Sequence, residues 1–164
     1  NKKDSIVTAL KQSISKALIG LEGEGLTVVQ KNGKVYISLE EDLLFASGNY
    51  ELSEKGIEVL GKVSDALDKS EDHIIRVEGH TDNVPLNGSA YMKSNWELSA
   101  ARALSVVHAL LQSQILDPDN IEAVAMGEFH PIADNASSEG RAENRRIEIY
   151  LTPKTKNINQ INNP

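Results

Sequence analysis

The sequence VEGHTDN at residues 77–83, followed by SNWELSAARA at residues 94–103, decides the centre of the fold. The apolar, β-rich run Ile74–Gly79 predicts a short strand that ends just before the polar His-Thr-Asp. Ser94 and Glu97 have the spacing of a capping box, which predicts that a helix begins there. We therefore expect a strand, a polar loop and a helix in this order.

The rest of the chain predicts a hairpin and further helices and strands. Asn32-Gly33 separates two alternating runs, Leu26–Lys31 and Lys34–Ser38, and favours a tight turn because both turn positions need a positive φ. Helices are expected at 4–19, 53–67, 94–112 and 138–143, and further strands at 121–126 and 146–151. This order predicts an α+β domain, an α/β sandwich, whose helices pack on a mixed sheet.

Helical periodicity assigns a buried face to each long helix. The expected buried residues are Ile57, Leu60, Val63 and Leu67 in one helix, and Ala100, Leu104, Val107 and Leu111 in the next. Residues 1–25 are interpreted as an N-terminal helix and linker, 26–152 as the folded domain, and 153–164 as a flexible polar tail. The first helix has its own apolar stripe, so it either packs on the core or connects to a segment upstream.

Composition narrows the classes of function. The 164 residues carry 24 acidic and 17 basic side chains, a formal net charge of −7, which argues against a nucleic-acid surface. The chain has no cysteine, so thiol catalysis, thiolate metal sites and disulfides are excluded. No apolar run approaches the roughly 20 residues that span a bilayer. Because the chain begins at Asn1 rather than Met, we expect that further residues precede it.

Asp82 and Arg102 are the candidate binding residues. Taken singly, Asp82 fits an Asx turn, and Arg102 lies off the expected apolar stripe, where a solvated surface arginine is the default. Together they face the crevice that a strand end and the next helix form in open α/β sheets. Arg102 could bind a carboxylate through its planar fork while Asp82 accepts from an ammonium. Substituting either one is expected to abolish binding and to leave stability nearly unchanged.

Other chemistries are less well supported by the sequence. His80 and Asp82 could join His108, His130 or Glu128 in a metal site, but no His-x-x-x-His pair is present. A serine hydrolase lacks its Gly-x-Ser-x-Gly elbow, and no glycine loop for a phosphate is present. We expect no cofactor and no metal. The basic segment 140–146 is interpreted either as local ion pairing or as a second positive wall of a site.

These motifs together resemble the OmpA-like peptidoglycan-binding family, in its MotB-type branch. The matching residues are Gly79-His80-Thr81-Asp82, Asn95 through Ala103, Gly127 with Pro131, Asn135, Gly140-Arg141-Ala142 and Asn144-Arg145-Arg146, with 43–48 as a further match. The similarity covers roughly residues 26–151. It implies a βαβαβ-type domain that binds the peptide stem of peptidoglycan without catalysis.

The resemblance also implies site residues and a setting. Asp82 and Arg102 would hold the free end of diaminopimelate. Thr81, Asn95 and Leu98 would line the same groove, with Arg145 or Arg146 at its border. The implied role is a periplasmic anchor of a membrane-attached envelope protein. Pairing of the domain into a homodimer is also expected. The alternative role is the periplasmic domain of a flagellar stator subunit, and a peptidoglycan hydrolase or metal enzyme ranks third.

Overall fold

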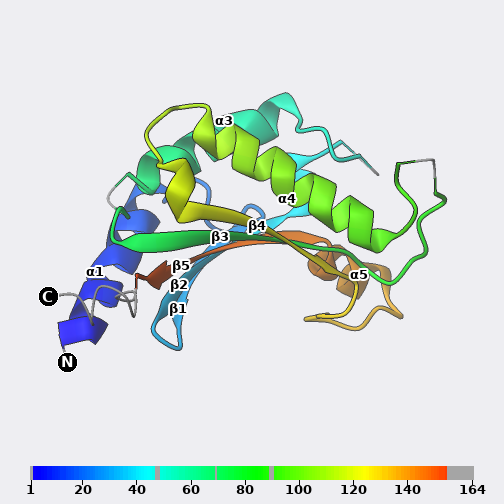
Figure 1. The fold of residues 1–164 in the computed structure, drawn as a ribbon. Coiled ribbons are helices and arrows are strands. Elements are labelled where there is room, and N and C mark those ends of the chain that lie inside the picture. The colour runs from blue at the N-terminus through cyan, green and yellow to red at the C-terminus, as the bar shows by residue number, and fades with distance from the viewer. Residues whose placement is uncertain (1, 47–48, 69, 89–90, 155–164) are drawn as a thin grey trace, which may run out of the picture.

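A five-stranded mixed sheet forms the centre of the molecule, with strand order β1-β2-β5-β3-β4 (Figure 1). The computed structural model describes residues 2–46, 49–68, 70–88 and 91–154. The strands are β1 Leu26–Lys31, β2 Lys34–Glu40, β3 His73–His80, β4 Ile121–Gly127 and β5 Arg146–Pro153. The helices are α1 Lys2–Ala17, α2 Glu41–Leu44, α3 Glu54–Ala66, α4 Asn95–Leu111 and α5 Ser138–Asn144, and Pro118–Asn120 forms the 3₁₀-helix η1.

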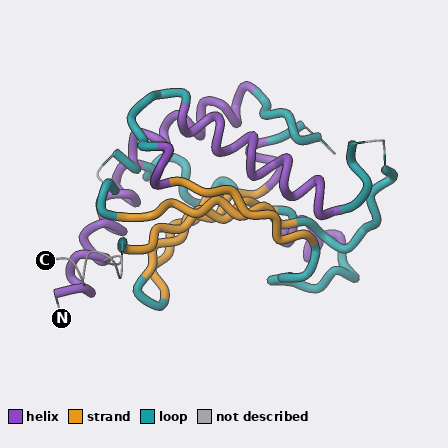
Figure 2. Tube along the Cα trace, in the orientation of Figure 1, coloured by secondary structure: helices purple, strands orange, loops and turns teal. Residues whose placement is uncertain are grey.

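The strand pairing confirms the predicted fold class. β1 and β2 form the hairpin, with positive φ at both Asn32 and Gly33. β5 lies antiparallel between β2 and β3, while β3 and β4 are parallel and joined by α4. The chain therefore brings the end of β3 and the start of α4 to the same end of the sheet as the start of β5, as Figures 1 and 2 show.

The two faces of the sheet differ in chemistry. Alternate strand residues point toward α1, α3 and α4 and are fully buried, such as Ile37, Val77 and Ile149. The other alternate residues, among them Glu78, Glu148 and Tyr150, point away from these helices. One face thus carries the hydrophobic core, and the opposite face is polar.

Helix α1 packs on the core, as one of the two interpretations of this segment predicted. Ile14 and Leu18 are buried, with 0% and 1% of their surface exposed. The apolar stripe of α1 is therefore covered by its own chain. It gives no support to a homodimer, which stays a prediction.

The buried face of α4 differs from the predicted one. Leu104 is 49% exposed, whereas Leu98, Ala103, Val106 and Leu110 are buried. A Cβ on Gly79 would lie 2.1 Å from the carbonyl oxygen of Ser99, so the backbones of β3 and α4 nearly touch. This close approach turns the small residues of α4 toward the sheet and Leu104 away from it. In α3 the predicted buried residue Ile57 is likewise 55% exposed.

Three further differences are two additional short helices and a longer final strand. The short helix α2 lies within a segment for which the sequence predicted no helix, and so does η1 at Pro118–Asn120. β5 continues to Pro153, the first residue of the predicted tail, and residues 155–164 of that tail lie outside the described residues. No helix in the described ranges is long and apolar enough to cross a membrane.

Candidate functional site

A polar groove lies where β3 ends, α4 begins and α2 and α5 approach each other. Its volume is about 470 Å³. Its lining residues come from four separate segments: Glu41 and Asp42; Thr81, Asp82, Val84, Pro85, Leu86 and Asn87; Asn95, Leu98 and Arg102; and Arg141 and Arg145. Six of the seven residues predicted to bind a ligand therefore line one groove.

Four charged side chains are paired in this groove. Arg145 Nη1 donates to Asp82 Oδ2 at 2.9 Å, and Arg145 Nε donates to Glu41 Oε2. Arg102 Nη2 donates to the other oxygen of Glu41. Glu41 thus bridges the two arginines, and the four formal charges sum to zero. We call these four residues, Glu41, Asp82, Arg102 and Arg145, the charge quartet.

The backbone around Asp82 is held by its neighbours. Asp82 Oδ1 accepts from the Val84 N–H at 3.0 Å, which is the Asx turn that the sequence predicted. Asn95 Nδ2 donates to the carbonyl oxygens of Asp82 and Val84, at 3.3 and 3.0 Å. Thr81 Oγ1 donates to the Asp82 carbonyl at 2.8 Å. In this structure Thr81 and Asn95 therefore fix the loop that carries Asp82.

Arg102 is buried rather than solvated. Its side chain is 3% exposed and contacts the Phe45 ring, with 5.2 Å from the guanidinium carbon to the ring centre. Its Nε donates to the Asn49 carbonyl oxygen at 2.9 Å. Burial lowers the pKa of Arg102, and the Glu41 carboxylate partly offsets this. The residue stays a cation, because arginine does not deprotonate in proteins.

Arg145 is the more accessible cation. It follows the end of α5, and 29% of its side chain is exposed. Partial burial alone would lower the pKa of Arg145, but its bonds to Asp82 and Glu41 outweigh burial and raise it. Its carbonyl oxygen also accepts from the Glu41 N–H at 2.9 Å, so the backbones of the two residues are joined.

Arg146 does not line this groove, which corrects its inclusion among the groove residues. It is the first residue of β5, and neighbouring residues of extended chain point to opposite sides. Its Nε donates to Glu148 at 2.8 Å and its Nη2 donates to the His130 carbonyl at 3.0 Å, on the polar face of the sheet. Arg145 is thus the arginine of this pair that borders the groove.

Glu41 is the member of the charge quartet that the sequence did not indicate as a site residue. It is 7% exposed although it stands in an acidic segment, Glu40–Asp42, that reads as a solvated surface. Its partners lie 61 and 104 positions further along the chain. A buried carboxylate needs such partners, but nothing local in the sequence identifies them.

Comparison with known proteins assigns the family. The family model described as "OmpA family" matches residues 44–145. The chain belongs to the OmpA family. Motility protein B of Bacillus subtilis (strain 168) is 32% identical over 118 residues, which cover 72% of this chain and 45% of that protein. This OmpA-family chain spans about half the length of that curated relative.

Two further relatives are a solved structure with the same fold and a protein whose name describes a ligand. A MotB-like protein from Desulfovibrio vulgaris, known from a crystal structure, has a TM-score of 0.82 and 29% identity, with 94% of this chain and all of that chain covered. Peptidoglycan-binding protein ArfA of Mycobacterium tuberculosis is 36% identical over 109 residues, 66% of this chain and 32% of that protein. Peptidoglycan binding is thus described for a relative of this OmpA-family chain, and the OmpA-family domains that bind peptidoglycan are non-catalytic.

Proposed function

We propose that the groove binds the peptide stem of peptidoglycan through the zwitterionic end of diaminopimelate. Asp82 takes the ammonium, and the arginines of the charge quartet take the carboxylate. The observation that carries this proposal is the quartet itself. It sets two carboxylates and two guanidiniums side by side in one groove, so it offers both signs of charge to a ligand that has both.

The ligand would enter by exchanging ion pairs. Because all four charges already have partners, an incoming ammonium replaces Arg145 at Asp82 while the ligand carboxylate takes up the Arg145 donors that this frees. No charge is left buried and unpaired at any stage of such an exchange. A ligand with a carboxylate alone would compete with Glu41 and leave Asp82 without a new partner. The groove is therefore expected to prefer a zwitterion to a simple anion.

The proposed setting is the periplasm, where the domain anchors a membrane-attached envelope protein to the cell wall. ArfA, whose name describes peptidoglycan binding, supports the attachment to the cell wall. The membrane attachment would belong to a segment upstream of Asn1.

A second candidate is the periplasmic domain of a flagellar stator subunit, which the similarity to Motility protein B favours. The two roles share the same groove and differ in what precedes it. The sequence upstream of Asn1 in the full-length gene distinguishes them. A single transmembrane helix that carries an aspartate supports the stator, whereas a lipoprotein-type signal supports the general anchor.

The binding proposal is tested by co-sedimentation with purified peptidoglycan that contains diaminopimelate. Asp82→Asn removes the charge but keeps the shape of the side chain, and it should weaken binding about tenfold or more, as expected for the loss of one charge-assisted contact. Asp119→Asn is the matched control, because Asp119 is exposed on η1 at the opposite end of β3 and β4. It should bind like the wild type.

Free diaminopimelate should displace the wild-type domain from the wall, and pimelate, which has the same carbon chain without the ammonium groups, should not. Circular dichroism and urea unfolding confirm that each variant is folded. Retention of full binding by folded Asp82→Asn, or equal displacement by pimelate, would refute the proposal.

A further inference from the structure

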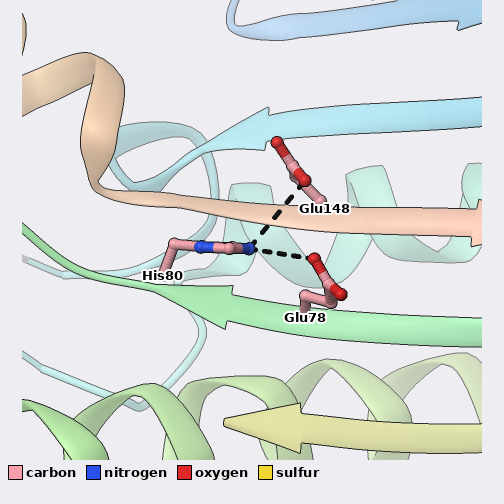
Figure 3. Close-up of side chains that lie close together, drawn as sticks. All are labelled: Glu78, His80 and Glu148. Carbon is pink, nitrogen blue, oxygen red and sulfur yellow. Dashed lines mark hydrogen bonds and ion pairs between the residues drawn. The ribbon is translucent and has the colours of Figure 1, made fainter. Parts of the chain in front are cut away.

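A second cluster of chemically active side chains lies on the polar face of the sheet, away from the groove. Glu78 and His80 stand two residues apart on β3, so both point to the same face. Glu148 on β5 is the direct cross-strand partner of Glu78. Figure 3 shows the His80 ring directed at both carboxylates.

The three side chains converge on one point. His80 Nε2 lies 3.0 Å from Glu78 Oε1 and 3.8 Å from Glu148 Oε2. These three potential ligand atoms all lie within 4.8 Å of one another. Ligand atoms of a metal with bonds near 2.1 Å stand about 3.0–3.4 Å apart in tetrahedral or octahedral geometry. Small side-chain rotations would therefore bring all three onto one ion.

Each carboxylate is held by the oxygen that does not face His80. Tyr150 donates its hydroxyl to Glu78 Oε2 at 2.8 Å, and Arg76 Nε lies 3.2 Å from the same oxygen. Arg146 Nε donates to Glu148 Oε1 at 2.8 Å. Hydrogen bonds of this kind orient the ligands of metal sites and keep one oxygen of each carboxylate directed inward.

An ion could reach this cluster from solvent. Glu78 and His80 are buried, but the Glu148 side chain is 21% exposed. All three line a hollow of about 610 Å³ whose walls include Tyr36, His130 and Tyr150. Water from this hollow could complete the coordination of an ion that has three protein ligands.

We propose that Glu78, His80 and Glu148 bind one divalent transition-metal ion of the Zn²⁺ class. One imidazole and two carboxylates suit such an ion better than Ca²⁺ or Mg²⁺, which take oxygen ligands. Two features limit the affinity. Arg76 and Arg146 already neutralise the two carboxylates, and His80 Nδ1 has no hydrogen-bond partner in the described part of the chain. The site is thus of moderate affinity and bridges β3 to β5.

Sequence spacing alone does not reveal this site. Asp82, which the sequence placed with His80 in a possible metal site, pairs with Arg145 in the groove instead. The third ligand, Glu148, comes from another strand. The proposal is independent of peptidoglycan binding, because none of its residues lines the groove.

Isothermal titration of the metal-free chain with ZnCl₂ tests the proposal, with CoCl₂ as a spectroscopic probe. We expect one ion per chain and a visible Co²⁺ absorption that shows nitrogen and oxygen ligands. His80→Gln should abolish saturable binding. Tyr150→Phe, which leaves the three ligands but frees Glu78, should weaken it about 10- to 100-fold. His108→Gln is the matched control, since His108 is exposed on α4, and it should bind like the wild type.

Urea unfolding of the metal-free variants shows whether each is folded, and Glu148→Gln replaces His80→Gln if the latter is not. Absence of saturable binding to the wild type would overturn the proposal. So would undiminished binding by the folded ligand variants, or loss of binding in His108→Gln.

Discussion

The pairing of Arg102 with Glu41 leads to a prediction on stability that the sequence alone contradicts. The sequence patterns predicted that Arg102 lies on the surface and that its replacement leaves the stability nearly unchanged. In the structure both side chains are less than a tenth exposed, and each satisfies the other. Arg102→Met keeps most of the apolar stem and leaves Glu41 buried with one partner, Arg145. We expect it to lower the free energy of unfolding by about 3 kcal/mol, the lower end for a broken buried pair.

The coupling between the two residues is the decisive quantity. Glu41→Gln should lower the free energy of unfolding by about 2 kcal/mol. This loss is smaller than that of Arg102→Met because Arg102 keeps its bond to the Asn49 carbonyl and its contact with Phe45. The double variant removes both charges, so neither is left buried without the other. We expect it to lower the free energy of unfolding by about 3 kcal/mol rather than by the sum of about 5 kcal/mol. The expected coupling energy is therefore about 2 kcal/mol.

Urea unfolding of the wild type, both single variants and the double variant at pH 7 measures this coupling. The matched control is the same cycle on Glu58 and Lys62, a pair of exposed residues on α3 separated by 3.6 Å, which should give about 0.3–0.5 kcal/mol. A coupling no larger than this control would refute the conclusion that Arg102 and Glu41 form a buried ion pair.

Two further predictions concern the backbone and pH. Gly79→Ala should destabilise the fold by about 1–3 kcal/mol or more, because its Cβ would meet the Ser99 carbonyl oxygen at 2.1 Å. Gly61→Ala in α3 is the control: no atom lies within 4 Å of its new Cβ, so it should stabilise the fold by up to about 1 kcal/mol. Thermal unfolding of both variants measures these changes. A Gly79→Ala variant as stable as the wild type would contradict the prediction. Burial lowers the pKa of His73 below 6.5, partly opposed by Asp72, so the unfolded chain takes up this proton first as the pH falls. Stability should be intact above pH 6.5 and decline below it by at most about 1.4 kcal/mol per pH unit, and urea unfolding from pH 7 to 5 should show a shallower decline in His73→Phe. An equal decline in both proteins would exclude His73 as the cause.

Local patterns in the sequence were enough to predict most secondary structure. The Asn32-Gly33 turn, the helix start at Ser94 and the alternation of β2 and β5 depend on residues within a few positions of each other. Such signals act through backbone dihedrals and nearby hydrogen bonds. The motif string around Asp82 also indicated the family, and with it the sheet with helices on one face.

The rotation of α4 about its axis was decided by tertiary packing. Periodicity favoured Leu104 as a core residue because leucine is apolar, yet Leu104 is exposed and Arg102 is buried. The contact of Gly79 with Ser99 sets how closely the helix approaches the sheet, and that distance selects which side chains fit beneath it. A hydrophobicity pattern contains no information on such a distance.

The partners of the charged residues were likewise decided only by the fold. The sequence determined that Asp82 follows a strand and that Arg102 lies in the next helix. It did not determine that Glu41 would bridge Arg102 and Arg145, or that Arg146 would turn to the opposite face beside Glu148. Ion pairs depend on distances of a few ångströms between segments many residues apart. Those distances exist only after the strands have paired and α4 has packed on the sheet.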